Sequence, residues 1–158
     1  MVNIRKILFP TDFSEYSLAA LDFAYDLTNR YTAQLHCMHV VDVVDNMILG
    51  EYVPTMEGIP PFAVGQIKET AEQRLDEFVK KHFSEFKNSI VKKVVMGKPF
   101  FEIIQYCRQE NIDLIVLGTH GHSALASMLL GSVAEKVVRK APCPVLTVRH
   151  LEHKFIAP

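Results

Sequence analysis

Five short apolar runs alternate along the chain with longer stretches in which apolar residues recur every three or four positions. The runs, rich in β-branched residues, occupy residues 7–9, 35–41, 90–96, 114–117 and 145–148. A run such as "LIVLG" lacks the polar alternation of a half-exposed strand, which indicates a sheet covered on both faces. Strands that alternate with helical stretches are typical of parallel sheets built from βαβ units.

Four amphipathic stretches supply the helices. The first follows Ser14, the second covers about 64–86, the third begins at Pro99 and ends near Asn111, and the fourth ends at Lys140. The apolar face of the second comprises Ile67, Ala71, Leu75, Phe78 and Val79. We therefore predict an α/β fold, an open five-stranded parallel sheet with the Rossmann-like order 3-2-1-4-5 and helices on both faces.

The length of 158 residues predicts one domain spanning residues 1–158. Two segments stand apart from the regular pattern: a long, flexible loop at 42–60, punctuated by glycines and prolines, and a C-terminal tail at 151–158. Loops of such length are uncommon in compact domains and serve as lids, binding loops or disordered segments. The sequence does not assign a role to either segment.

Composition limits the classes of binding partner that are expected. Apolar residues make up 49% of the chain, charged residues 22%, and the formal net charge is −1, so no global field attracts nucleic acid or anionic lipid. No apolar run reaches the roughly 18 residues of a membrane span, and the N-terminal apolar stretch is too short for a signal peptide. A cytoplasmic protein without membrane insertion is expected. Its three cysteines are widely spaced without a CxxC pair, which favours buried, reduced thiols.

Topology predicts where a ligand binds. In a doubly wound sheet, ligands lie beyond the carboxyl ends of the strands, at the point where the strand order reverses. If the first strand is central and the fourth lies beside it, the two loops at this point are "PTDFS" at 10–14 and "GTHGHSALASMLLGS" at 118–132. Both loops contain residues suited to a nucleotide, a carboxylate in one and a glycine cluster in the other.

Three known nucleotide-binding motifs do not match this sequence. No glycine follows the first strand, so the dinucleotide fingerprint GxGxxG is absent, and no lysine precedes Ser132, so a Walker A loop is absent too. The stretch "THGH" at 119–122 is similar to a nucleotidylyltransferase signature, but it follows the fourth strand instead of the first. What remains is the spacing Gly118-xx-Gly121-x9-Gly131-Ser132.

Gly131 predicts a helix boundary. Inside a continuous helix it would cost about 1 kcal/mol relative to alanine, whereas Ser132 followed by Glu135 has the pattern of a capping box at a helix start. The free amides and positive dipole end of such a helix bind anions, and Mg²⁺ can neutralise phosphate where lysine is lacking. The alternative is that the glycines serve only a turn and close packing.

Other polar residues have two interpretations each. Asp12 is placed to accept hydrogen bonds from ribose hydroxyls, or to cap a helix with Glu15 as its capping partner. His36 and His39 project to opposite faces of one strand and are predicted to be structural. His120 and His122 alone make a weak metal site.

Three stretches resemble the universal stress protein family, specifically its ATP-binding branch: "KILFPTDFSEYS", "LHCMHVVD" and "IVLGTHGHSALASMLLGSVAEKVVRKAPCPVLTVR". The last reproduces the family's GxxG-x9-G[ST] pattern. The resemblance implies that Asp12 holds the ribose, that Val40 presents backbone atoms to adenine, and that Leu117 lies against the nucleoside. It further implies a pocket shaped by Pro10 and Thr11 and phosphate contacts from Gly118, Gly121, His122, Gly131, Ser132 and Val133.

The resemblance also implies a ligand, an assembly and a role. The ligand is ATP, or ADP or AMP, with Mg²⁺ held through its phosphates and not by a separate metal site, and family members pair through the last strand, here Val145 to Val148. The expected role is a nucleotide-dependent switch of the stress response, with at most slow hydrolysis and a regulatory protein partner left open. Two alternatives remain: an ATP-hydrolysing or nucleotidyl-transferring enzyme, and an interaction protein without nucleotide.

Overall fold

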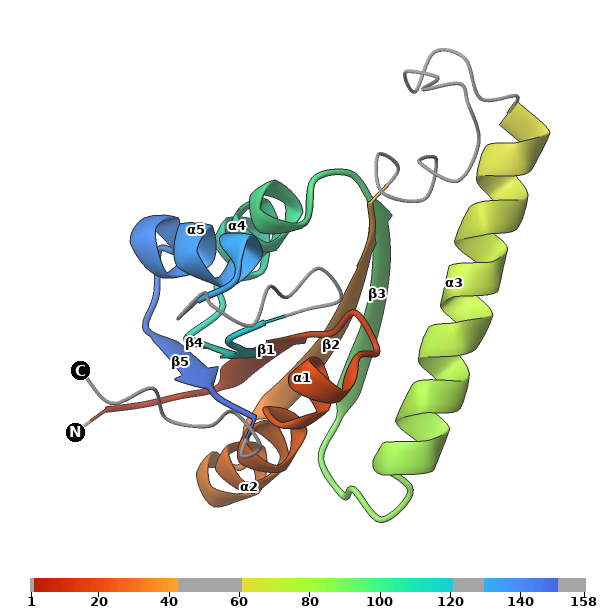
Figure 1. The fold of residues 1–158 in the computed structure, drawn as a ribbon. Helices are drawn as coiled ribbons and strands as arrows, with labels where there is room; N and C mark the ends of the chain where they lie inside the picture. The colour runs from red at the N-terminus through yellow and green to blue at the C-terminus, as the bar shows by residue number, and fades with distance from the viewer. Residues whose placement is uncertain (1, 43–60, 121–129, 151–158) are drawn as a thin grey trace.

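The computed structural model describes residues 2–42, 61–120 and 130–150, which form a five-stranded parallel sheet with helices on both sides (Figure 1). The strands are β1 (Lys6–Pro10), β2 (Gln34–Val41), β3 (Ile90–Met96), β4 (Leu114–Gly118) and β5 (Val145–Val148). The helices are α1 (Glu15–Leu18), α2 (Leu21–Tyr31), α3 (Pro61–His82), α4 (Pro99–Glu110) and α5 (Ser132–Lys140). The strand order is β3-β2-β1-β4-β5, which confirms the predicted topology.

Side chains of the central strands alternate between two apolar layers. Ile7 and Phe9 of β1 belong to the cluster that includes α2 and α3, whereas Leu8 between them belongs to the cluster that includes α4 and α5. All three side chains are completely buried. Burial on both faces explains the continuous apolar runs of β1 and β4, because residues 7–10 and 114–118 are all buried.

Two predicted helix boundaries differ from the structure. The helix after Ser14 is divided into α1 and α2, and Ala19 and Ala20 connect them. The second predicted helix begins at Pro61 and ends at His82, so it starts and stops earlier than 64–86. Phe83 and Phe86, which extended the apolar period, lie beyond α3 and pack against Tyr25 of α2 at ring-centroid distances of 6.1 and 5.1 Å.

Several predicted features fall on residues that the structure does not describe. Gly121 and His122 belong to this group, as do the tail at 151–158 and the 42–60 loop except for Asp42. Among the helices of the described residues, none is long and apolar enough to cross a membrane.

Candidate functional site

Strands β1 and β4 separate at their carboxyl ends. Their register covers only Ile7 with Leu114 and Leu8 with Ile115, whereas β4 stays paired with β5 as far as Gly118. Beyond Leu8 the two neighbouring strands therefore diverge at the point where the strand order reverses. This is the position at which open α/β sheets bind ligands.

The loop after β1 is held by hydrogen bonds of its own side chains. The Thr11 N–H donates to the carbonyl oxygen of Met38 (2.8 Å), and the Thr11 hydroxyl lies 2.9 Å from that of Ser17. Asp12 Oδ1 accepts from both the N–H and the hydroxyl of Ser14, at 3.0 and 2.5 Å. The Asp12 carboxylate is thus fixed directly beyond the strand, half-exposed, with a defined orientation.

The interpretation of Asp12 as a helix cap is wrong. Ser14 is the N-cap of α1, and its side-chain oxygen accepts the N–H of Ser17 at 3.2 Å. Asp12 lies two residues earlier and closes a turn over Ser14 instead, a local bond that aspartate makes readily. Glu15 is the first residue of α1 and is exposed.

Phe13, which sequence reasoning missed, has a left-handed backbone with φ of 64°. Its ring lies 4.4 Å from that of His39 and 5.4 Å from that of Phe78, and the Arg74 guanidinium lies 4.5 Å from its centroid. His39 Nδ1–H also donates to the Thr11 carbonyl oxygen at 2.8 Å. Packing on both α3 and β2 therefore holds a backbone conformation that costs a non-glycine residue about 1–3 kcal/mol.

Gly118 at the end of β4 is in close contact with α1. A Cβ atom at this position would lie 2.3 Å from the carbonyl oxygen of Tyr16 and 3.3 Å from the Cα of Ser17. The first glycine of the motif is therefore required by backbone packing against α1, whereas the alternative interpretation assigned it to a turn and gave close packing to Gly131. The same contact brings the loop after β1 and the end of β4 together, which the predicted topology requires.

The start of α5 is tied to the end of β4. The Gly131 N–H donates to the Thr119 carbonyl oxygen at 2.7 Å, and the Thr119 N–H donates to Val148 at 2.9 Å. Gly131 is the N-cap of α5, and its carbonyl oxygen accepts the first intrahelical bond, from Glu135, at 2.9 Å. The amides of Ser132 and Val133 precede that bond, so they have no partner within the helix.

The helix thus begins at Ser132 as predicted, but the capping box is wrong. Ser132 is the first helical residue, and Gly131, with extended backbone angles, takes the N-cap position without a side-chain bond. Glu135 Oε1 lies 3.1 Å from Arg139 Nε, one turn further along the exposed face of α5. The Ser132 hydroxyl is consequently not used as the cap of its own helix.

The remaining predicted residues lie near the carboxyl ends of β1, β2 and β4 and at the start of α5. Pro10 is buried as the last residue of β1 and pairs with Met38, so Val40 lies two residues beyond the final β1–β2 partner. The Leu117 side chain is buried in the cluster formed with α4 and α5. Val133 packs partly against that cluster, which leaves its backbone amide as the group available to an anion.

His36, His39 and His120 each contact other residues of the fold. His36 bonds to Tyr106 on the α4 face and His39 contacts Phe13 on the α3 face, so the two project to opposite sides as predicted. His120 is buried, with Nδ1 3.0 Å from the Thr119 hydroxyl and its ring 5.9 Å from that of Tyr16.

Within the described part of the chain, no three metal-ligating side chains converge. The described groups of the loop after β1 and the start of α5 include backbone amides, hydroxyls and the Asp12 carboxylate, which suit a sugar phosphate.

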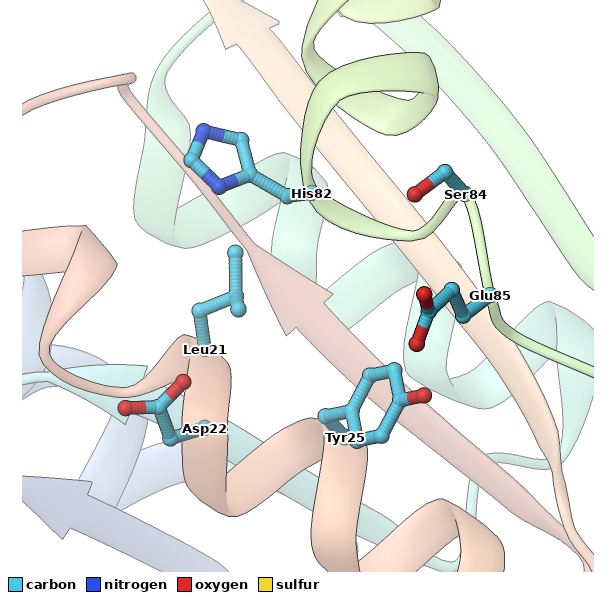
Figure 2. Close-up of a pocket in the computed structure, with 6 residues that line it drawn as sticks. All are labelled: Leu21, Asp22, Tyr25, His82, Ser84 and Glu85. Carbon is cyan, nitrogen blue, oxygen red and sulfur yellow. The ribbon is translucent and has the colours of Figure 1, made fainter.

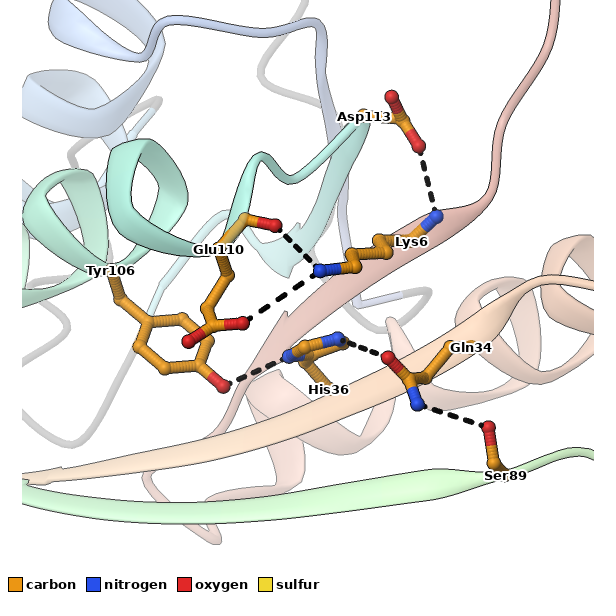
Figure 3. Close-up of polar contacts among 7 residues, drawn as sticks. All are labelled: Lys6, Gln34, His36, Ser89, Tyr106, Glu110 and Asp113. Atoms are coloured by element: carbon orange, nitrogen blue, oxygen red, sulfur yellow. Dashed lines mark hydrogen bonds and ion pairs between the residues drawn. The ribbon is translucent and has the colours of Figure 1, made fainter.

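A polar network lies at the opposite edge, where the strands begin (Figure 3). His36 Nδ1 lies 2.8 Å from the Tyr106 hydroxyl, and its Nε2 lies 3.0 Å from Gln34 Oε1. Lys6 Nζ donates to the carbonyl oxygen of Glu110 at 2.8 Å, and Asp113 Oδ2 accepts the Lys6 backbone N–H at 2.9 Å. These bonds join β1 and β2 to the end of α4 and stabilise the fold away from the candidate site.

A cavity of about 260 Å³ lies between α2 and the C-terminal end of α3 (Figure 2). It is lined by Leu21, Asp22, Tyr25, His82, Ser84 and Glu85. Burial and then Lys81 lower the pKa of His82, while Asp22 opposes the shift. None of these residues belongs to the loops after β1 and β4, so the cavity is separate from the candidate site.

Comparison with known proteins gives one consistent result. A sequence model of the universal stress protein family matches residues 3–149. Universal stress protein MJ0531 of Methanocaldococcus jannaschii is 36% identical over 145 residues, covering 92% of this chain and 82% of that protein. The solved structure of MJ0577 from the same organism is 30% identical, with a TM-score of 0.77 over 96% of this chain and 99% of that one. A universal stress protein in complex with cAMP is 24% identical, with a TM-score of 0.67 over 92% and 97%, and shows the shared fold alone.

Proposed function

The chain belongs to the universal stress protein family, and from this premise we propose that it is a stress-response regulator that binds an adenine nucleotide, with ATP as its ligand. The observation that carries the proposal is the bond between the Gly131 N–H and the Thr119 carbonyl oxygen. It fixes the amino end of α5 beside the end of β4, at the point where β1 and β4 diverge and Asp12 follows β1.

The described residues fit such a ligand chemically. A carboxylate held in a fixed orientation, as Asp12 is by Ser14, is a strong acceptor for the two hydroxyls of a ribose. The amides of Ser132 and Val133 and the dipole of the nine-residue helix α5 favour phosphate. The Gly131 amide is already used by Thr119, so we assign the phosphate contacts of this helix start to Ser132 and Val133.

Magnesium is proposed to arrive with the nucleotide. Mg²⁺ retains several waters and binds mainly through phosphate oxygens in such sites, and the described residues contain no three converging ligands that would hold it alone. We expect nucleotide affinity to fall when Mg²⁺ is removed with a chelator. A metal that stays bound to nucleotide-free protein would contradict this part of the proposal.

The central test compares Asp12→Asn with the unchanged protein. Asparagine keeps an acceptor for Ser14 but removes the charge, and a hydrogen bond to a charged group contributes about 1.5–3 kcal/mol, so ATP affinity should fall about tenfold or more. Isothermal titration calorimetry measures this. Glu15→Gln is the matched control, because it removes the same charge from an exposed neighbouring residue. Equal affinity in all three proteins would defeat the assignment of Asp12.

The alternatives predict different results for the unchanged protein. Freshly purified protein should release an adenine nucleotide when it is denatured, which chromatography identifies. Turnover with Mg²⁺ above about one per minute would favour an enzyme. An empty preparation whose thermal midpoint does not respond to millimolar ATP would favour an interaction protein.

We further propose that two chains pair through β5. This strand lies at the edge of the sheet, next to β4 alone, and an edge strand offers unpaired backbone groups to a two-fold mate. Val145, Leu146 and Thr147 are half-exposed. The same proposal includes a regulatory protein partner whose binding depends on whether this chain holds a nucleotide.

A further inference from the structure

The backbone of the loop after β1 is strained at Phe13. Among the described residues, three other than glycine have a positive φ, and two of them, Thr32 and Asn111, are the C-caps of α2 and α4. Left-handed residues commonly end helices. Phe13, with φ of 64°, ends no helix and comes directly after Asp12. Strain of this kind persists only where the surrounding structure imposes it, and it is concentrated at ligand sites.

The left-handed conformation orients the Asp12 carboxylate. Asp12 Oδ1 accepts the Ser14 N–H at 3.0 Å and the Ser14 hydroxyl at 2.5 Å. The φ and ψ of Phe13 set where Ser14 lies relative to Asp12, because they are the soft dihedrals of the one residue between them. A change of φ to the ordinary negative range would turn the Ser14 donors away. The orientation of the carboxylate therefore depends on the backbone of Phe13.

The side chain of Phe13 is held between β2 and α3. Its ring lies 4.4 Å from the ring of His39 in β2 and 5.4 Å from that of Phe78 in α3. The Arg74 guanidinium of α3 lies 4.5 Å from the ring centroid, within the range of a cation–π attraction. Phe78 is itself only 9% exposed and belongs to the core. Contacts from two elements thus stabilise the strained residue.

We propose that Phe13 is a positioning residue of the nucleotide site, through which α3 controls recognition of the ribose. The inference rests on the proposed function, in which Asp12 accepts the ribose hydroxyls. Ring contacts hold the left-handed backbone, and that backbone presents the Asp12 carboxylate in one orientation. Such preorganisation raises affinity, because the acceptor does not lose further freedom when the ligand binds.

A comparison of ATP with dideoxy-ATP, which lacks both ribose hydroxyls, isolates this role. The unchanged protein should bind ATP about tenfold more tightly, because only ATP donates hydrogen bonds to the Asp12 carboxylate. General destabilisation of the site would weaken both nucleotides equally and leave their ratio of affinities unchanged. Isothermal titration calorimetry with each nucleotide therefore separates a positioning role from a merely structural one.

Two substitutions of Phe13 separate its ring from its backbone. Phe13→Ala removes the ring contacts and leaves a residue that disfavours positive φ. Its preference for ATP over dideoxy-ATP should fall by about fivefold or more, the equivalent of the strain that the ring contacts sustain. Phe13→Gly also lacks the ring but adopts positive φ readily, so it should keep more of the preference than alanine does.

Arg74 provides a test that leaves the core unchanged. Arg74 is exposed on α3, so Arg74→Gln should remain folded. The variant loses the cation over the Phe13 ring, and its preference for ATP should fall about twofold to fivefold, the equivalent of an exposed cation–π contact. Lys81→Gln is the matched control, because it removes the same charge from another exposed residue of α3 and should keep the full preference.

A double variant tests whether Phe13 acts through Asp12. Once Asp12 is asparagine, Phe13→Ala should weaken ATP binding little further, because effects that pass through one group are not additive. Additive effects would overturn the inference. So would a preference for ATP that is unchanged in Phe13→Ala, or higher there than in Phe13→Gly. If the unchanged protein bound no ATP, the proposed function would be refuted and this inference with it.

Discussion

At the scale of a single residue, Gly118 belongs to the glycine motif and also lies at a close contact between β4 and α1. Its replacement by alanine puts a methyl group 2.3 Å from the Tyr16 carbonyl oxygen, a distance that only a backbone shift relieves. Such overpacking typically costs about 1–3 kcal/mol. We expect Gly118→Ala to lower the free energy of unfolding by that amount in urea denaturation, with or without nucleotide.

Gly65→Ala is the matched control for this substitution. Gly65 lies on the exposed side of α3, and a Cβ there meets no atom within 4 Å. Alanine should therefore stabilise the protein by about 0.5–1 kcal/mol, because glycine is a poor helix former. If both variants were equally stable, the close contact between β4 and α1 would be refuted.

His36 makes stability depend on pH. Burial and then Lys6 lower its pKa below 6.5, while Glu110 opposes the shift. The unfolded chain then binds more protons than the native protein near pH 6, so stability rises with pH in this range and is lost as pH falls through 6.5. His82, whose pKa is also lowered, acts in the same direction.

Denaturation midpoints at pH 7.5 and 5.5 measure this loss, and an NMR titration assigns it to His36. Tyr106→Phe serves as a second probe, since it removes the hydroxyl 2.8 Å from His36 Nδ1 and leaves the ring in the core. The variant should be less stable at pH 7.5, by roughly the 1–3 kcal/mol of an unsatisfied buried group. A His36 pKa at or above 6.5 would contradict the burial argument.

At the scale of elements, the start of α5 allows helix capping and ligand binding to be tested separately. Ser132 is exposed and is not the N-cap, so Ser132→Ala should change the free energy of unfolding by less than about 0.5 kcal/mol. ATP affinity should nevertheless fall about tenfold, because we propose that the Ser132 hydroxyl adds a phosphate contact to that of its amide, and the variant loses this hydrogen bond to a charged group. A loss of about 1 kcal/mol in stability, with affinity unchanged, would restore the capping box.

The sequence predicted some of these elements more accurately than others. Strands β3 and β5 match their predicted bounds, although both are only partly buried and β3 contains the exposed Lys92 and Lys93. The capping box failed because a glycine in extended conformation caps a helix as readily as the serine after it, and no local pattern distinguishes the two. Phe13 was missed because its left-handed backbone depends on His39, Phe78 and Arg74, residues that are distant in sequence.

At the scale of the whole molecule, β5 carries the proposed pairing of two chains. Ile115 and Thr119 of the β4 side donate to the carbonyl oxygens of Pro144 and Val148, and strand periodicity then directs the Thr147 N–H away from β4. Thr147→Pro removes only that outward donor, and an edge strand tolerates proline. We expect the variant to remain folded but to lose pairing.

Light scattering checks this at micromolar concentration. The unchanged protein should have twice the mass of the 17.9 kDa chain, and the variant should have the mass of one chain. Circular dichroism confirms that the variant is folded. A folded Thr147→Pro variant that still dimerises would place the interface elsewhere.

The topology was predictable at this scale, and the separation of β1 and β4 was not. Alternating apolar runs and amphipathic stretches indicated a parallel sheet covered by helices, and the predicted order 3-2-1-4-5 is confirmed. The divergence arises from contacts between distant segments, Gly118 against Tyr16 and Gly131 against Thr119.

Helix α5 is about 14 Å long, and its two ends serve the two proposed interactions. Its first residues carry the proposed phosphate contacts, and its last residue, Lys140, leads through residues 141–144 into β5, the strand proposed to pair with a second chain. Thermodynamic linkage then couples the two proposals. If pairing changes nucleotide affinity by some factor, bound nucleotide must change the equilibrium constant for pairing by the same factor. A cell that altered its ratio of bound to free nucleotide would in that case also change the fraction of paired chains.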